Sequence, residues 1–589
     1  MSREHNEVFA FGPFRLDATE RLLFEGGVQI ALAPKALQTL LLLVQRRGRL
    51  VEKSELLKIV WPDTYAEEGT LAQNIFTLRK QLREGDGGIV YIETVPKRGY
   101  RFVAPVTVHT AQAELVAAAP VIATQGAESR LMLVVLPIDN LSGNADSDFM
   151  SDGFTEAIIS EIGSFNPEQL GVIARTSAMT YKATKKTVRE VAAELNVQYL
   201  LEGSLRHSHD RLMVTTQLIR ASDQTQLWAK NYERPLHDVL RVQSEVAAAV
   251  AHEISIRLTV RREPPAAVPT VDPVVYELYM RGRYSWNKRT EEGLRQAIEY
   301  YERAIAIDPH FARAHCGLAS CWTWRGLYGN HALKDALPKA KVAALRALEL
   351  EPRLSEAHSA LGLTVTWLEY DWVQGERELL RGIETDPNSA MAYHWYAVFL
   401  SLLARHEEAL QQVRMAVHFD PVSPNSRMIY GVILDMAGHY NAAIEEHEKV
   451  LAQTPRHYIT RVMLGTILCR MACWEEAIGH LQLAYEHSGF QPDLLAHIGA
   501  GYAAAGMRQE ALEVLDQLAK TALPCSPYFV ARVHAGLGNI DATVALIEQA
   551  YEERLLLLAS SSNDFFLQPA RHDPRFQAVI AKMRFPQFC

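Results

Sequence analysis

One predicted helix, at residues 70–83, carries the side chains whose types and spacing are best suited to binding a ligand. Leu71, Ile75, Leu78 and Leu82 recur at intervals of four, three and four residues, which predicts one buried helix face. The remaining surface carries amide, hydroxyl and cationic groups and one aromatic ring, on Gln73, Asn74, Phe76, Thr77, Arg79, Lys80 and Arg83. Because such groups bind base edges and phosphates, we predict that this face contacts double-stranded DNA.

A basic hairpin follows this helix. Residues 91–94 and 100–103 are predicted strands, rich in aromatic and β-branched side chains. Their connector ends in glycine and places Lys97 and Arg98 at the tip. Since two cations suit a minor groove or a phosphate backbone, Lys97 and Arg98 join the candidate DNA-binding residues.

Residues 8–106 resemble the winged-helix DNA-binding domain of the bacterial OmpR/PhoB-type transcription regulators. The matching segments are 11–17 (FGPFRLD), 32–36 (LAPKA), 48–51 (GRLV), 60–63 (VWPD), 78–82 (LRKQL) and 91–102 (YIETVPKRGYRF). The resemblance implies a winged helix-turn-helix of the α+β class whose recognition helix, at 70–83, reads the major groove. The family often carries arginine where this chain has Phe76 and Thr77, so the resemblance predicts the fold and not the target sequence.

Composition divides the chain electrostatically. The whole chain of 589 residues has a net charge of -9, yet residues 8–105 hold 14 Lys and Arg against 11 Asp and Glu. That stretch therefore has a charge of +3 and the remainder about -12, so only the amino-terminal domain favours nucleic acid. Six cysteines without a Cys-x-x-Cys pair favour a reduced, cytoplasmic compartment. The polar amino terminus predicts no signal peptide.

We also considered a membrane span, because regulators of the CadC and ToxR kind continue into one. The most apolar part of the following segment, residues 115–123, has nine residues, whereas a span needs ~20. We therefore expect no membrane association, and the Ala, Gln and Thr content of residues 107–129 predicts a flexible linker.

Residues 130–260 are predicted to form a mixed α/β domain, because short apolar runs at 131–136, 172–174 and 199–201 alternate with helical patterns. This stretch resembles the TolB amino-terminal-like domain. Asp152, Arg175 and Glu202 in its matching motifs form a ligand-sensing site on one hypothesis and serve turns and strand ends on the other. We favour the second, because no metal or nucleophile spacing joins them.

The last region is repetitive. Prolines at 352, 387, 421 and 455 are separated by 35, 34 and 34 residues, the period of tetratricopeptide repeats, and Pro309 precedes them. This resemblance predicts an all-α solenoid whose groove binds a protein or peptide partner; a purely structural scaffold is the alternative. Five tryptophans could anchor a peptide in the groove, although we expect most to be core wedges. They are Trp322, Trp324, Trp367, Trp372 and Trp395.

No enzymatic motif stands out, so we expect no catalytic residue, no cofactor and no metal site. Cys469 and Cys473 lie one helical turn apart and could hold a metal or react with an oxidant, but buried thiols are the commoner outcome.

These observations predict a cytoplasmic, sequence-specific transcription regulator whose domain order resembles the HilA-type regulators. The predicted segments are 1–106 (winged helix), 107–129 (linker), 130–260 (TolB-like), 261–273 (linker), 274–560 (tetratricopeptide array) and 561–589 (cap). We expect the two later domains to fold separately if the chain is cut near Arg262. Because no receiver domain precedes the winged helix, control is expected through these domains, and RNA polymerase is a candidate partner. The alternative is an interaction scaffold whose winged helix docks on protein.

Overall fold

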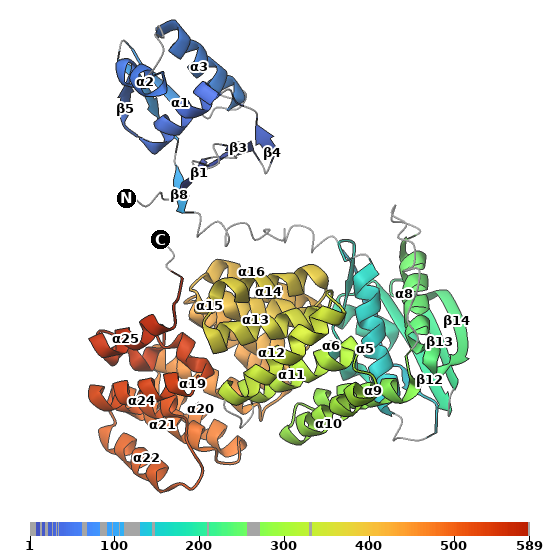
Figure 1. Ribbon diagram of the computed structural model, residues 1–589. Coiled ribbons are helices and arrows are strands. Elements are labelled where there is room, and N and C mark those ends of the chain that lie inside the picture. Colours follow the sequence, from blue (N-terminus) through green and yellow to red (C-terminus); the bar gives the residue numbers. More distant parts are fainter. Residues whose placement is uncertain are drawn as a thin grey trace. The chain divides into compact units, whose positions relative to one another are not determined.

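The chain forms two compact units in this computed structural model, the first within residues 1–121 and the second within residues 122–587 (Figure 1). The structure describes residues 7–11, 14–17, 22–25, 28–30, 32, 34–46, 48–61, 68–82, 91–96, 98–104, 106–110, 130–143, 148–165, 167–208, 211–255, 271–328 and 333–586.

The first unit is a small α+β domain built on two antiparallel sheets. The five-stranded sheet has the order β4-β3-β2-β1-β8 and the three-stranded sheet the order β5-β7-β6. The strands are β1 (Glu7–Phe11), β2 (Phe14–Asp17), β3 (Leu22–Glu25), β4 (Val28–Ile30), β5 (Leu50–Glu52), β6 (Ile92–Val95), β7 (Gly99–Phe102) and β8 (Thr107–Thr110). The helices are α1 (Pro34–Gln45), α2 (Lys53–Val60) and α3 (Glu68–Gln81). The predicted winged helix-turn-helix is confirmed.

Aromatic rings form the centre of this unit. The Phe11 ring meets that of Phe102 edge to face at 5.0 Å, and the Phe14 ring meets that of Tyr91 at 5.6 Å. These contacts join the amino-terminal sheet to the strands of the hairpin, since Phe11 and Phe14 lie on β1 and β2. Aromatic pairs add ~0.5–1.5 kcal/mol beyond the area that they bury, so the hairpin is held by the sheet behind it.

The domain extends beyond residue 106, where we expected the linker to begin. Thr107–Thr110 form β8, which pairs antiparallel with β1 in the register Ala10↔Thr107 to Glu7↔Thr110. The β-branched sequence Thr-Val-His-Thr suits a strand, and it covers an edge of β1 that would otherwise be open. The rest of the predicted linker, residues 111–129, lies outside the described residues.

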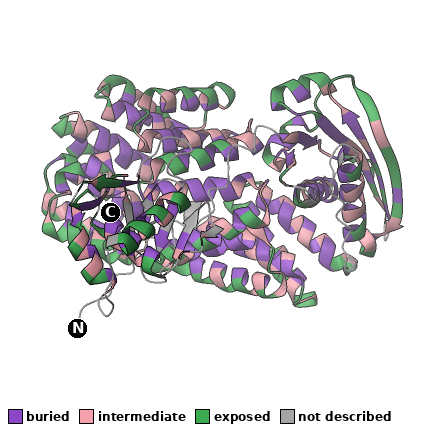
Figure 2. Cartoon of the chain, turned by 90° about the horizontal axis from the view of Figure 1, so that it is seen from above, coloured by how far each residue is buried: buried purple, intermediate pink, exposed green. Residues whose placement is uncertain are grey.

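The second unit begins with a mixed sheet of order β11-β9-β12-β13-β14, with β10 beside β12. Its first three strands are parallel and the last two antiparallel, as the predicted mixed α/β domain requires. The elements are β9 (Leu131–Val135), β10 (Asp139–Asn140), α5 (Asp148–Phe165), β11 (Leu170–Val172), α6 (Arg175–Ala178), η3 (Met179–Tyr181), α7 (Val188–Leu195), β12 (Tyr199–Ser208), β13 (Arg211–Arg220), β14 (Thr225–Pro235), η4 (Leu236–Asp238) and α8 (Val239–Ser255). Buried and exposed positions alternate along most of β13, whereas the edge strand β14 is mostly exposed (Figure 2).

An array of paired helices follows, as the proline spacing predicts. Each of the five prolines lies two residues beyond the end of a helix. Helices α10, α12, α14, α16 and α18 end at residues 307, 350, 385, 419 and 453. The helices are α9 (Pro273–Asn287), α10 (Glu291–Ile307), α11 (Ala312–Tyr328), α12 (Leu333–Leu350), α13 (Ser355–Glu369), α14 (Trp372–Thr385), α15 (Ala390–Leu402), α16 (His406–Phe419), α17 (Pro424–Met436), α18 (Tyr440–Gln453), α19 (Tyr458–Arg470), α20 (Trp474–His487), α21 (Pro492–Ala504), α22 (Arg508–Lys520), α23 (Pro527–Gly536), α24 (Ile540–Glu552), η5 (Leu556–Ser560), η6 (Phe565–Ala570) and α25 (Pro574–Lys582).

The mixed sheet and the array share a core, although we expected them to separate near Arg262. One apolar cluster runs from β9 and α5 through α9 to α11. Buried polar contacts reinforce the junction: the Asn388 amide donates to the Gly163 carbonyl oxygen at 2.8 Å. The Asp420 carboxylate accepts from the Ser177 hydroxyl at 2.6 Å and from the Ser426 hydroxyl at 3.0 Å. Burial raises the pKa of Asp420, so these donors are needed to hold its charged form.

The inner helices of the array are covered as well. Eleven of the fifteen residues of α13 and ten of the thirteen residues of α15 are buried. The open groove that we expected along the array is therefore closed at α13 and α15, and Trp367, Trp372 and Trp395 are buried as core wedges. Trp322 and Trp324 are half-buried.

Two histidines inside the array lack the partners that usually accompany buried polar groups. His394 in α15 and His447 in α18 are 1% and 0% exposed. Among the described residues, their ring nitrogens have no hydrogen-bond partner. Burial lowers the pKa of each to about 4, so both rings are neutral in the folded protein.

The first prediction concerns the hairpin that follows α3. A Cβ on Gly99 would collide with the Val51 carbonyl oxygen, so Gly99→Ala should destabilise the first unit by about 3 kcal/mol. Gly69 in α3 has open space around its Cβ position, so Gly69→Ala should stabilise by about 0.5–1 kcal/mol. Urea unfolding of a fragment spanning residues 1–110 measures both changes. Equal effects would contradict the contact at Gly99.

The second prediction concerns pH. Below pH 6.5 His394 and His447 bind protons in the unfolded chain but stay neutral in the folded protein. The free energy of unfolding therefore falls as the pH is lowered towards 4. With pKa values of about 4 against 6.5, each contributes up to about 3 kcal/mol to this loss. His447→Gln should reduce the loss measured by urea unfolding at pH 7 and pH 4.5. The matched control, His310→Gln, replaces an exposed histidine and should leave the loss unchanged.

Candidate nucleic-acid interface

Helix α3 presents the expected polar face. Leu71, Ile75, Leu78 and Leu82 are at most 2% exposed, which confirms the predicted buried face. On the other side Gln73, Phe76 and Lys80 are exposed. The Phe76 ring, 63% exposed, is unusual for so large an apolar side chain. It suits contact with a thymine methyl group or another apolar surface.

Thr77 and Asn74 on α3 are less available for ligand contacts than Gln73, Phe76 and Lys80. The Thr77 hydroxyl donates to the Gln73 carbonyl oxygen at 2.9 Å, so it is partly engaged by its own helix. Asn74 is half-buried, and its amide nitrogen is buried without a hydrogen-bond partner among the described residues. An unpaired buried donor costs about 1–3 kcal/mol, so a ligand that supplied an acceptor would recover part of this cost.

Arg79 connects the helix to the hairpin. One of its terminal nitrogens donates to the Ile92 carbonyl oxygen at 2.7 Å and to the Thr94 hydroxyl at 2.8 Å. Both acceptors lie on β6, so this guanidinium fixes β6 against α3. We predicted a phosphate contact for Arg79 from its side of the helix; its hydrogen bonds to a strand distant in sequence were not visible in the spacing.

The hairpin places its tip next to β5. The Lys53 amide donates to the Arg98 carbonyl oxygen at 3.1 Å, while the Arg98 side chain is exposed. Glu93 and Arg101 pair across the two strands at 3.5 Å. Lys97 and Arg83, which we also predicted to bind DNA, lie outside the described residues.

Helices α1 and α2 support α3. Lys35 donates to the Val60 carbonyl oxygen at 2.5 Å and satisfies an acceptor at the carboxyl end of α2. Arg46, the residue after α1, pairs with Glu55 of α2. These contacts fix the angle between the helices behind α3, and sequence reasoning did not find them.

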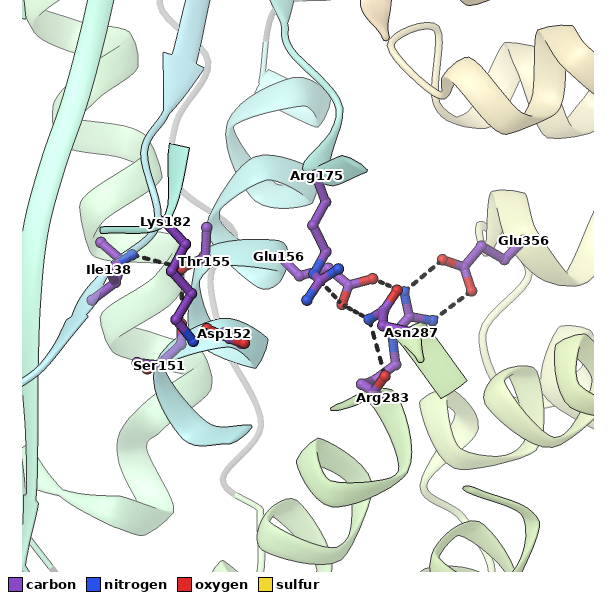
Figure 3. A network of polar contacts seen from close by, with 10 residues as sticks. All are labelled: Ile138, Ser151, Asp152, Thr155, Glu156, Arg175, Lys182, Arg283, Asn287 and Glu356. Atoms are coloured by element: carbon purple, nitrogen blue, oxygen red, sulfur yellow. Dashed lines mark hydrogen bonds and ion pairs between the residues drawn. The ribbon is translucent and has the colours of Figure 1, made fainter. Parts of the chain in front are cut away.

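Each of the three candidate residues of the mixed sheet has a different ion-pair or hydrogen-bond partner. Asp152 pairs with Lys182 at 2.8 Å, and Glu202 accepts from the Gln217 amide at 2.9 Å. Arg175 lies 3.5 Å from Glu156 in the network of Figure 3. This outcome favours structural roles for all three.

The network of Figure 3 joins α5 to the array through residues that sequence reasoning missed. Arg283 of α9 pairs with Glu156 and, at 2.8 Å, with Glu356 of α13. Asn287 donates to Glu156 at 3.1 Å. A buried cation such as Arg283 needs such partners, so the network is a structural junction.

Within the described residues, no group of three or more His, Cys, Asp and Glu could hold a metal ion. Cys469 is buried, which raises the pKa of its thiol to about 12, whereas Cys473 is exposed. The two thiols are therefore in different environments. No helix in the described part of the chain has the length and apolarity to cross a membrane.

Two family models match the chain. The family described as "Transcriptional regulatory protein, C terminal" matches residues 27–102, and the tetratricopeptide repeat family matches residues 378–411. The first match covers α1, α2, α3 and the hairpin, which are the elements of the candidate interface.

Relatives resemble different parts of the chain. "Putative adenylate cyclase 3" of Rhizobium meliloti is 32% identical over 238 residues, which are 40% of each chain. "Transcriptional regulator HilA" of Salmonella typhi is 24% identical over 449 residues, 75% of each chain. "Transcriptional activator CadC" of Escherichia coli is 33% identical over 100 residues, 17% of this chain and 20% of that protein. The chain thus spans two fifths of the first relative and three quarters of the second.

The family match, the geometry of α3 with its hairpin and the repeats agree with one another. The chain carries an OmpR/PhoB-type winged-helix domain at its amino terminus and tetratricopeptide repeats in its carboxy-terminal half, an order that matches the HilA-like architecture.

Proposed function

We propose that this chain is a sequence-specific DNA-binding transcription regulator in which α3 enters the major groove and the hairpin β6–β7 lies on the minor groove or the backbone. The observation that carries the proposal is the division of α3 into a buried apolar face and an exposed face with Gln73, Phe76 and Lys80. Amides and cations on such a face suit base edges and phosphates. Such a role places the protein with the chromosome, in the cytoplasm.

We assign different roles to the candidate DNA-binding residues according to their exposure and hydrogen bonds. Gln73, Phe76 and Thr77 face outward on α3 and are assigned to the bases, with Asn74 beside them. Lys80, Arg83, Lys97 and Arg98 are assigned to phosphates. Arg79 holds the hairpin at a fixed angle to α3 through β6, which makes it a positioning residue.

The second unit is proposed to supply control, and the chain is proposed to be non-catalytic. The TolB-like assignment of the mixed sheet is a resemblance, and Asp152 and Arg175 serve as ion-pair residues within the second unit. Because the mixed sheet and the array share a core, a conformational change caused by a ligand on one would alter the packing of the other. A protein partner, with RNA polymerase as one candidate, would dock on exposed surfaces of this unit rather than along α13 or α15.

A second candidate function rests on the exposed Phe76, which would also suit docking of the winged helix on a protein. The salt dependence of DNA binding distinguishes the two functions, because counterion release requires phosphate contacts.

The third prediction is therefore that a 1–110 fragment and the full chain bind DNA with a log-log salt slope of roughly -3 to -4, at about -0.9 for each of four phosphate contacts. Lys80→Ala with Arg98→Ala should flatten the slope by about 2 and weaken all sequences evenly. Lys520→Ala, an exposed cation in α22, is the matched control and should change neither. Fluorescence anisotropy across a salt series measures this, and a flat dependence for the unaltered chain would favour protein docking.

The fourth prediction distinguishes a residue that contacts bases from a residue that positions the hairpin. Gln73→Ala should cost about 1–3 kcal/mol on the best site and change the preferred sequence, because it removes a bidentate amide. Arg79→Ala should instead weaken all sites, since it frees β6 from α3. Selection from a random DNA library reports the preferred sequence, with Gln45→Ala, an exposed amide in α1, as the control. Altered preference in Arg79→Ala but not in Gln73→Ala would reverse the assignment.

A further inference from the structure

The carboxy-terminal residues contact a helix pair more than two hundred residues earlier in the chain. After α25 ends at Lys582, the chain continues without regular secondary structure through residues 584–586. The Trp372 indole nitrogen, at the start of α14, donates to the Met583 carbonyl oxygen at 2.8 Å. A side chain of the array thus binds the main chain of the tail.

An aromatic stack accompanies this hydrogen bond. The Phe585 ring lies 4.6 Å from the Trp372 ring at an interplanar angle of 26°, and the Trp372 ring lies 5.8 Å from that of Phe399 in α15. Trp372 is 3% exposed and Met583 is fully buried. The tail therefore covers part of the Trp372 side chain at the start of α14.

A neighbouring contact brings the tail to this surface. The Tyr370 ring stacks on that of Tyr551 in α24 at 5.9 Å, and the Arg554 guanidinium lies 4.8 Å from the Tyr370 ring. Arg554 and Tyr370 both adopt left-handed backbone conformations, which end α24 and α13 at this point. The array is thus curled so that its last helices reach its third pair.

We propose that Trp372 is the centre of a peptide-binding site and that residues 583–586 of the same chain occupy it. An indole N–H directed at a main-chain carbonyl and a ring that stacks on one aromatic side chain are features by which a protein surface binds a short peptide segment. Arg584 has a φ of 53°, so the bound segment turns at this residue. The occupant is favoured by its covalent attachment, which gives an effective concentration in the millimolar range. A free peptide with an aromatic residue two positions after an apolar one would have to displace the tail. This inference concerns the second unit and is independent of DNA binding.

Removal of the tail should leave the site around Trp372 open to a free peptide. A chain lacking residues 583–589 should bind a labelled peptide copied from residues 583–589, with Cys589→Ser, in a saturable manner. The full-length chain should bind the same peptide at least tenfold more weakly, because its own tail occupies the site. A peptide carrying Phe585→Ala should not bind the truncated chain. Equal affinity for both chains, or no binding to a truncated chain with an unchanged circular dichroism spectrum, would overturn the proposal.

Hydrogen exchange tests the same site without truncation. In the full-length chain, Phe585→Ala should accelerate exchange in residues 365–375, because the tail no longer covers Trp372. Phe490→Ala, which removes an aromatic ring that is 61% exposed elsewhere in the array, should leave this segment unchanged. Unchanged exchange in Phe585→Ala, or the same change in both variants, would show that the tail does not occupy the site.

Discussion

A helix that is apolar along one face is stable in water only when another element covers that face, and this constraint shapes both units of the chain. In the winged helix, the leucine and isoleucine face of α3 is covered by α1 and the aromatic core. In the second unit, each helix pair of the array is covered by the next pair. The mixed sheet covers the first pairs, and the last pairs curl back to the third.

The same constraint makes the interface specific. Because the apolar face of α3 is buried, its rotation about its own axis is fixed, and Gln73, Phe76 and Lys80 must point outward together. Arg79 then fixes the hairpin relative to the helix through two hydrogen bonds, each worth roughly 0.5–3 kcal/mol. DNA readers need base-contacting and phosphate-contacting groups at a fixed separation, which this geometry supplies.

The junction between the mixed sheet and the array combines apolar burial with polar pairing. Arg283, Glu156 and Glu356 form a network whose removal from water is costly unless every charge is paired. Asp420 is held by hydroxyl groups of Ser177 and Ser426 rather than by a cation. Such contacts tolerate only one relative placement of the two parts, so the sheet and the array behave as one body.

The local features could be predicted from the sequence: the buried face of α3, the hairpin after it, the mixed sheet and the helix ends two residues before each proline. These follow from periodicity and from proline stereochemistry, which act over a few residues. Four features became visible in the folded chain: Thr107–Thr110 complete the first sheet, Arg79 bonds to β6, the mixed sheet shares its core with the array, and Trp372 contacts Phe585. Each of these joins residues far apart in the chain, and spacing along a sequence carries no information about which distant partner will cover an exposed edge, cation or ring.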